Sequence, residues 1–172
     1  ESVGIRAVRR VCSEYAKEDG RENLTPEDIF DIAEGIAEGN VNAARQAFSQ
    51  LGKAAADAIV HALDIIDGLV VIGGGLSGAA KYIVPAMKEQ MRSRLSTFGG
   101  DQFPCLQSEI FDLDDPEELA EFLKDDSTLV RVPGTESSLR YKNSRKTCIA
   151  VSSIGTSKAV ALGAYAFALN KS

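Results

Sequence analysis

The fold of this chain is decided by one short stretch, residues 67–77, which runs Asp67-Gly68-Leu69-Val70-Val71-Ile72-Gly73-Gly74-Gly75-Leu76-Ser77. Residues 69–72 are apolar and mostly β-branched, a composition that predicts a strand buried on both faces of a sheet. The three consecutive glycines that follow place no side chain between the backbone and a ligand. Apolar residues then recur at helical spacing up to about residue 94, which predicts a helix.

A strand, a glycine turn and a helix N-terminus together are typical of sites that bind anions or nucleotides, because free N–H groups and the helix dipole attract negative charge. The same layout also serves simply to pack a helix closely on a sheet, so the pattern alone leaves both interpretations open. It departs from the dinucleotide-binding pattern, because Gly74 crowds the turn and no suitably spaced acidic residue follows on a second strand. The Walker pattern is absent from the sequence. A Rossmann dehydrogenase and a P-loop enzyme are therefore disfavoured.

Composition and charge narrow the classes of function. The 172 residues suffice for one domain with a core, and 44% hydrophobic content is ordinary for a soluble globular protein. The net charge of −6 argues against nucleic acid or an anionic membrane as the general partner. No apolar run reaches the length of about 18 residues that predicts a membrane span. The chain starts at Glu1, and we expect residues 1–172 to be a single excised piece of a longer protein.

The residues most often used in catalysis are sparse in this sequence. Cys12, Cys105 and Cys148 form no C-x-x-C pair, which favours buried, inert thiols in a reduced, cytoplasmic setting. His61 is the only histidine and lies within a long helical pattern, so a structural role is expected. The acid pair Glu27 and Asp28 follows a helix start and is explained by capping. We therefore predict no catalytic residue and no metal site in this chain.

The rest of the sequence predicts an α/β fold that is rich in helices and has a small mixed sheet. Helices are expected over residues 2–17, 25–39 and 42–66, from residue 115, and over residues 158–170. Strands are expected over residues 106–113 and 147–152, with a β pair at 128–132 and 138–142. The last helix is apolar nearly all round, so we expect it to be buried on most sides.

Three segments, taken together, resemble a known family: the opening Ser2-Val3-Gly4-Ile5, the stretch 67–77 and the closing residues 153–165. They are similar to the C-terminal half of ROK-family proteins, bacterial sugar kinases and sugar-responsive repressors with the actin-like, ribonuclease-H-like ATPase fold. Residues 96–146 form a longer connection than the family usually has. By this resemblance Gly73, Gly74, Gly75 and Leu76 would lie against the adenosine part of ATP, and Ser77 would open the next helix.

The resemblance implies that the full-length protein is an ATP-dependent hexose or amino-sugar kinase, similar to glucokinase, that uses ATP with magnesium. The alternative is the effector-binding part of a sugar-responsive transcriptional repressor. The family's phosphate-binding motif, catalytic aspartate and zinc motif are not in this chain and are expected upstream of Glu1, so the piece alone should be inactive. The implied partners are the sugar and ATP, without nucleic acid or membrane. We also expect a homo-oligomer, with residues 159–169 as a candidate contact surface.

Overall fold

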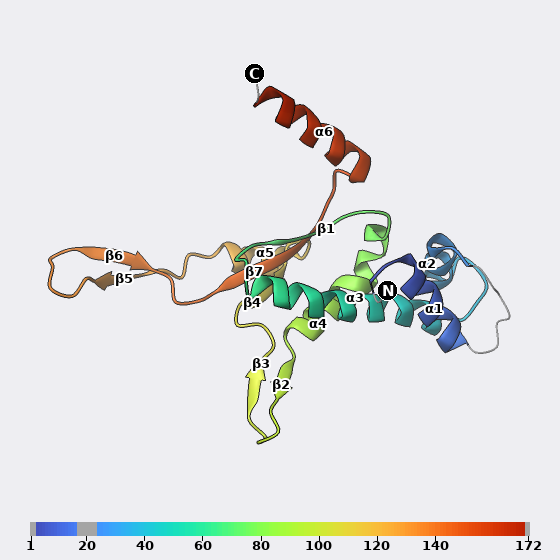
Figure 1. The fold of residues 1–172 in the computed structure, drawn as a ribbon, viewed down its shortest axis with the longest axis horizontal. Helices are drawn as coiled ribbons and strands as arrows, with labels where there is room; N and C mark the ends of the chain where they lie inside the picture. Colours follow the sequence, from blue (N-terminus) through green and yellow to red (C-terminus); the bar gives the residue numbers. More distant parts are fainter. Residues whose placement is uncertain (1–2, 17–23, 171–172) are drawn as a thin grey trace.

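The computed structural model describes residues 3–16 and 24–170, which form a helical layer against a small sheet, with three projections (Figure 1). Its helices are α1 (Ile5–Ala16), α2 (Pro26–Glu34), α3 (Val41–Leu63), a 3₁₀ turn η1 (Ser77–Ala79), α4 (Ala80–Met91), α5 (Pro116–Leu123) and α6 (Thr156–Leu169). Its strands are β1 (Val70–Ile72), β2 (Arg94–Ser96), β3 (Gln102–Pro104), β4 (Glu109–Asp112), β5 (Thr128–Arg131), β6 (Ser138–Tyr141) and β7 (Lys146–Val151).

Helix α2 begins where the sequence predicts and ends earlier than expected. The Thr25 hydroxyl accepts the Asp28 N–H at 3.2 Å, and the Asp28 carboxylate accepts the Thr25 N–H at 2.7 Å. This reciprocal capping box confirms that Asp28 is a capping residue. The helix stops at Glu34 because Gly35 adopts a left-handed conformation with φ of 77°. The predicted end near Gly39 is therefore wrong by about one turn.

Helix α3 is the element on which α1, α2 and α4 pack. Its small residues allow a close approach, as the alanine-rich pattern predicts. At Gly52 the approach is so close that an added Cβ atom would lie 2.5 Å from the backbone oxygen of Ile83 in α4. The helix ends at Leu63 rather than near residue 66, and Asn40 caps its start. The α3–α4 packing therefore depends on a glycine at position 52.

The sheet is wholly parallel, in the order β1-β7-β4, so the expected mixed sheet is wrong. Strand β7 lies in the centre, and Thr147, Cys148 and Ile149 are buried, which confirms the prediction of a buried strand. Strand β1 is covered on one face only, since Leu69 just before it and Val71 within it are 61% and 66% exposed. Its expected burial on both faces is therefore wrong, because the described helices cover only the other side.

Residues 94–145 contribute strand β4 to the sheet and also form helix α5 and two antiparallel hairpins. The expected strand over 106–113 is shorter, Glu109–Asp112, and the predicted β pair is confirmed as β5–β6. The hairpin β2–β3 was not predicted. Helix α5 is held to α4 by Glu118, whose carboxylate accepts hydrogen bonds from the Lys88 ammonium at 2.5 Å and the Asp112 N–H at 2.6 Å. Its inward face packs through Phe122 on Phe111, with ring centroids 5.8 Å apart.

Helix α6 stands away from the body, and its side chains from residue 157 onward are exposed (Figure 1). The expectation that this apolar helix is buried on most sides is therefore wrong for this structure. The exposed large apolar side chains of the helix are Val160, Leu162, Tyr165, Phe167 and Leu169. In the part of the chain that the structure describes, no helix has both the length and the apolar character needed to cross a membrane.

The contact at Gly52 generates a stability prediction. Gly52→Ala should lower the free energy of unfolding by about 1–3 kcal/mol, because α4 must move to relieve the overlap with the Ile83 carbonyl. Gly163→Ala is the matched control, since a Cβ there meets no atom within 4 Å and alanine favours the helix by about 0.4–1 kcal/mol. Urea denaturation followed by circular dichroism measures both changes. Equal stability of the Gly52→Ala variant and the wild type would contradict the close contact.

Candidate functional site

The predicted site residues form a turn at the carboxyl end of β1, which we call the glycine corner (residues 73–77). Gly74 has φ of 98°, a conformation that favours glycine. The Ser77 hydroxyl donates to the Gly74 carbonyl at 2.7 Å, and the Ser77 N–H reaches the same oxygen at 3.1 Å. Ser77 then opens η1, which leads directly into α4. The corner is therefore a hydrogen-bonded turn that leads from β1 into η1 and α4.

Packing does not explain why positions 73–75 of the corner are all glycine. A Cβ atom built on Gly74 or Gly75 meets no atom within 4 Å, and one on Gly73 meets only the Ser152 side chain at an ordinary 3.8 Å. No described element therefore covers these glycines. The interpretation of the corner as a mere close contact between helix and sheet is disfavoured by this open space. A bare backbone facing open space instead suits close approach by a ligand.

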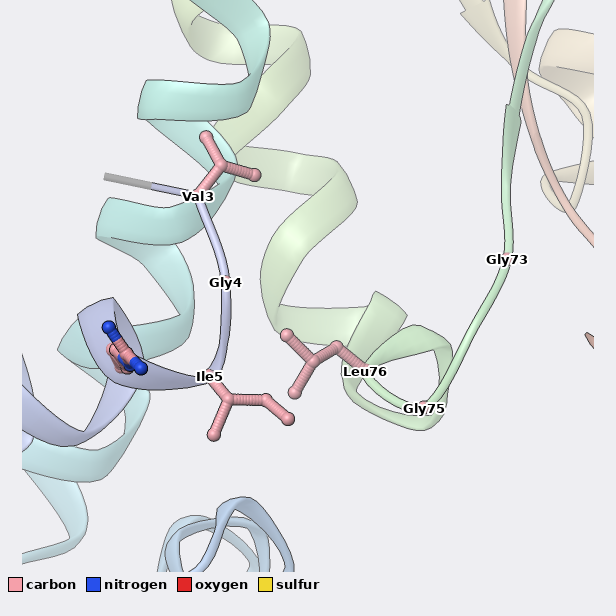
Figure 2. A pocket seen from close by; sticks show the side chains of 7 residues that line it. Val3, Gly4, Ile5, Gly73, Gly75 and Leu76 are labelled. Atoms are coloured by element: carbon pink, nitrogen blue, oxygen red, sulfur yellow. The ribbon is translucent and has the colours of Figure 1, made fainter. Parts of the chain in front are cut away.

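A cavity of about 490 Å³ lies between the glycine corner and the start of α1 (Figure 2). Leu76 extends from the corner toward Ile5, while Gly73 and Gly75 present only backbone (Figure 2). The cavity is lined by Val3, Gly4, Ile5, Arg6, Gly73, Gly75 and Leu76. The sequence patterns assign no ligand role to Ile5 and Arg6, the residues of α1 that line this cavity. No local signal marks them, because the wall joins segments that are far apart in the sequence.

A second cavity, of about 230 Å³, lies on the α2 side of the same corner. It is largely apolar and contains two aromatic rings, and its lining residues are Pro26, Glu27, Phe30, Phe48, Gly75, Leu76, Gly78 and Ala79. Gly75 and Leu76 thus line both cavities. The corner therefore separates the two cavities. The larger one is lined partly by bare glycine backbone, and the smaller one by aromatic side chains.

The aromatic wall is held in place by an ionic cluster behind it. The Phe48 and Tyr82 rings stack with centroids 6.1 Å apart, and Phe30 packs edgewise on both. The Tyr82 hydroxyl lies 2.7 Å from the Glu34 carboxylate, which also accepts a 2.5 Å hydrogen bond from Lys81. The hydrogen bond from Lys81, followed by that from Tyr82, lowers the pKa of Glu34 below its usual 4.5. The cluster therefore joins the end of α2 to the first turn of α4.

The remaining candidate residues have structural surroundings. His61 lies on the exposed side of α3, where its ring nitrogen Nδ1 is 2.6 Å from the Asp57 carbonyl, so its expected structural role stays a prediction. Cys12 and Cys148 are buried as predicted, whereas Cys105 is only half-buried. Burial raises the pKa of the Cys148 thiol, which disfavours its reactive thiolate form. Within residues 3–16 and 24–170, no three His, Cys, Asp or Glu side chains gather in a group that could hold a metal ion.

Among solved structures, the chain is similar to the crystal structure of glucokinase from Parabacteroides distasonis ATCC 8503. The two chains are 44% identical, with a TM-score of 0.83 over 99% of this chain. The α/β fold therefore matches part of a glucokinase. This chain covers 45% of that one, less than half its length. Comparisons with known protein families and with curated proteins find no match.

The ionic cluster predicts a pH-dependent contribution to stability. Because the folded state lowers the pKa of Glu34, its contribution is complete above pH 4.5 and is lost as the pH falls through the lowered value. The destabilisation caused by Glu34→Gln should therefore be largest near neutral pH and shrink below about pH 4.5. Denaturation at a series of pH values measures it. Tyr82→Phe, which keeps the ring stack, should give part of the effect, and a destabilisation independent of pH would contradict the assignment.

Proposed function

We propose that residues 1–172 form the nucleotide-side lobe of an ATP-dependent hexose or amino-sugar kinase of the ROK type, with the actin-like fold. The observation that carries the proposal is the 44% identity with a glucokinase over nearly the whole chain. The open backbone of the glycine corner, with a cavity on each side, supports a nucleotide contact at residues 73–77. The similarity to a glucokinase also supports the kinase over the repressor as the function of the full protein.

The site fits the nucleoside part of ATP on two grounds. A purine base is flat and apolar on its faces. These properties match the second cavity, on the α2 side of the corner, which is lined by two aromatic rings. The backbone at Gly74 and Gly75 leaves open space where a side chain would otherwise stand, so the ribose and the first phosphate can approach it. The helix that starts at Ser77 and continues as α4 adds the positive end of its dipole, which favours an anion at the corner. Gly73, Gly74, Gly75, Leu76 and Ser77 are therefore the proposed nucleotide-binding residues.

In this proposal the chain supplies nucleotide binding and orientation rather than the reacting groups. ATP with magnesium supplies the transferable phosphoryl group, and that transfer needs a positioned base and metal-held phosphates. On the ground of the family resemblance, we assign the catalytic base, the magnesium contacts and the zinc site to parts of the full-length protein outside this chain. The isolated piece should thus be inactive. The three free cysteines suit a reduced, cytoplasmic location, which we include in the proposal.

A substitution at Gly75 tests the nucleotide assignment in the full-length protein. Gly75→Val should raise the KM for ATP by about tenfold, equivalent to about 1.4 kcal/mol, while the KM for the sugar stays nearly unchanged. Gly75 is preferable to Gly74 because its φ lies outside the left-handed region and its added Cβ meets no atom within 4 Å. The folded protein therefore tolerates the change, and only a bound ligand would be displaced. A coupled kinase assay with varied ATP and varied sugar measures both constants.

Gly68→Val is the matched control for this experiment. A Cβ at Gly68 also meets no atom within 4 Å, and the residue precedes β1 at the end away from the glycine corner. This variant should keep the KM for ATP of the wild type. An unchanged KM for ATP in Gly75→Val, with thermal stability preserved, would overturn the adenosine assignment. Absence of any sugar kinase activity in the wild type would overturn the proposed function itself.

A further inference from the structure

The second cavity, of about 230 Å³, is the proposed place of the purine base, and we call it the base slot. Two of its rings, Phe30 of α2 and Phe48 of α3, are placed in different ways. Phe48 is only 1% exposed and belongs to the hydrophobic core, so packing fixes its ring. Phe30 is half-buried and lies on a helix of nine residues. The position of its ring therefore depends on the contacts that hold α2.

The last turn of α2 is held to α3 and α4 by three side chains. Arg45 of α3 donates from Nε to the Ala33 carbonyl at 2.9 Å, which satisfies an oxygen at the helix end. The Tyr82 hydroxyl of α4 lies 3.1 Å from the same oxygen and 2.7 Å from the Glu34 carboxylate. Lys81 donates to the other oxygen of that carboxylate at 2.5 Å. Glu34 thus accepts two hydrogen bonds from the first turn of α4.

The Phe30 ring lies on the same side of α2 as this anchor. Phe30 and Glu34 are four residues apart, and residues at this spacing are neighbours on one side of a helix. The Lys81 ammonium contacts both, since it lies 5.7 Å from the centre of the Phe30 ring while bonded to Glu34. Glu34 itself does not line the base slot. Its effect on a bound base must therefore act through the position of α2 and of the Phe30 ring.

We propose that Glu34 is a positioning residue for the nucleotide, which sets the affinity for the base by holding Phe30 in place beside the slot. The inference rests on the proposed kinase function and adds to it a residue outside the nucleotide contacts. Helix α4 follows the glycine corner through η1, so the bonds from Glu34 to α4 fix the two sides of the slot relative to each other. Binding groups that neighbouring contacts hold in the bound geometry lose less entropy when the ligand binds.

Steady-state kinetics of the full-length protein, with ATP and sugar varied separately, test this role. Glu34→Ala should raise the KM for ATP about three- to tenfold, the factor that corresponds to loss of about one hydrogen bond, while kcat and the KM for the sugar stay within about twofold. Glu34→Gln keeps an acceptor oxygen and should restore part of the affinity. Calorimetric titration with ATP should give the same order of affinities without turnover.

Glu118→Ala is the matched control, because Glu118 holds the other end of α4 in the same way. Its carboxylate accepts hydrogen bonds from Lys88 at 2.5 Å and from the Asp112 N–H at 2.6 Å. Its side chain is 26% exposed, against 21% for Glu34. This variant should lose comparable stability but keep the KM for ATP within about twofold of the wild type. The comparison therefore separates positioning of the slot from a general loss of stability.

Tyr82→Phe and the choice of base give two further measurements. Tyr82→Phe keeps the ring stack and removes one of the two bonds to Glu34, so this milder variant should raise the KM for ATP about two- to threefold. A pyrimidine presents a smaller face to the rings than a purine does. Glu34→Ala should therefore lower the ratio of kcat/KM for ATP to that for CTP, whereas Glu118→Ala should leave this ratio unchanged.

The outcomes separate this inference from the kinase assignment. An unchanged KM for ATP in Glu34→Ala, in a protein that phosphorylates sugar, overturns the positioning role and leaves the kinase assignment standing. An equal rise in Glu118→Ala also overturns it, because the effect would then follow stability alone. A wild type that transfers no phosphoryl group to a sugar overturns the kinase assignment, and the positioning role with it. Circular dichroism confirms that each variant is folded.

Discussion

The structure depends on the close contact between α3 and α4 at Gly52. A hydrogen atom in place of a side chain lets the Ile83 carbonyl approach α3, and α4 takes its position from this approach. Because α4 follows η1 and the glycine corner without a break, the placement of α4 sets where the corner lies relative to α1 and α2. The widths of both cavities beside the corner therefore follow from a packing contact outside them.

Polar contacts also tie the position of α4 to the elements at each of its ends. At its start, Lys81 and Tyr82 hold Glu34 and thereby the end of α2, which carries the aromatic wall. Near its other end, Lys88 holds Glu118 and thereby α5. Helix α4 thus connects the candidate nucleotide site to the extension that bears the hairpins. A side chain at position 52, which would displace α4, should therefore affect both the candidate nucleotide site and the extension.

The features that the sequence predicted well are those that local chemistry determines. Proline and the Thr25–Asp28 capping box start α2, and the glycines of residues 73–75 mark the corner, because both signals lie within a few residues. The exposed side of β1 and the exposure of α6 were missed, since periodicity shows how apolar an element is but not what covers it. The α1 wall of the larger cavity was missed for a similar reason. It arises because the tertiary fold brings Ile5 and Leu76 to the same cavity, which no local pattern encodes.

The strand order β1-β7-β4 has a consequence for how this fold is made. The central strand, β7, is the last of the three along the chain, and both of its neighbours pair only with it in the described sheet. During synthesis from the N-terminus, β1 and β4 therefore leave the ribosome without their hydrogen-bonding partner. The sheet closes only after residue 151 has emerged, a late and non-local step of the kind that slows folding. Until then the nascent chain carries two unpaired strands, whose open edges favour aggregation.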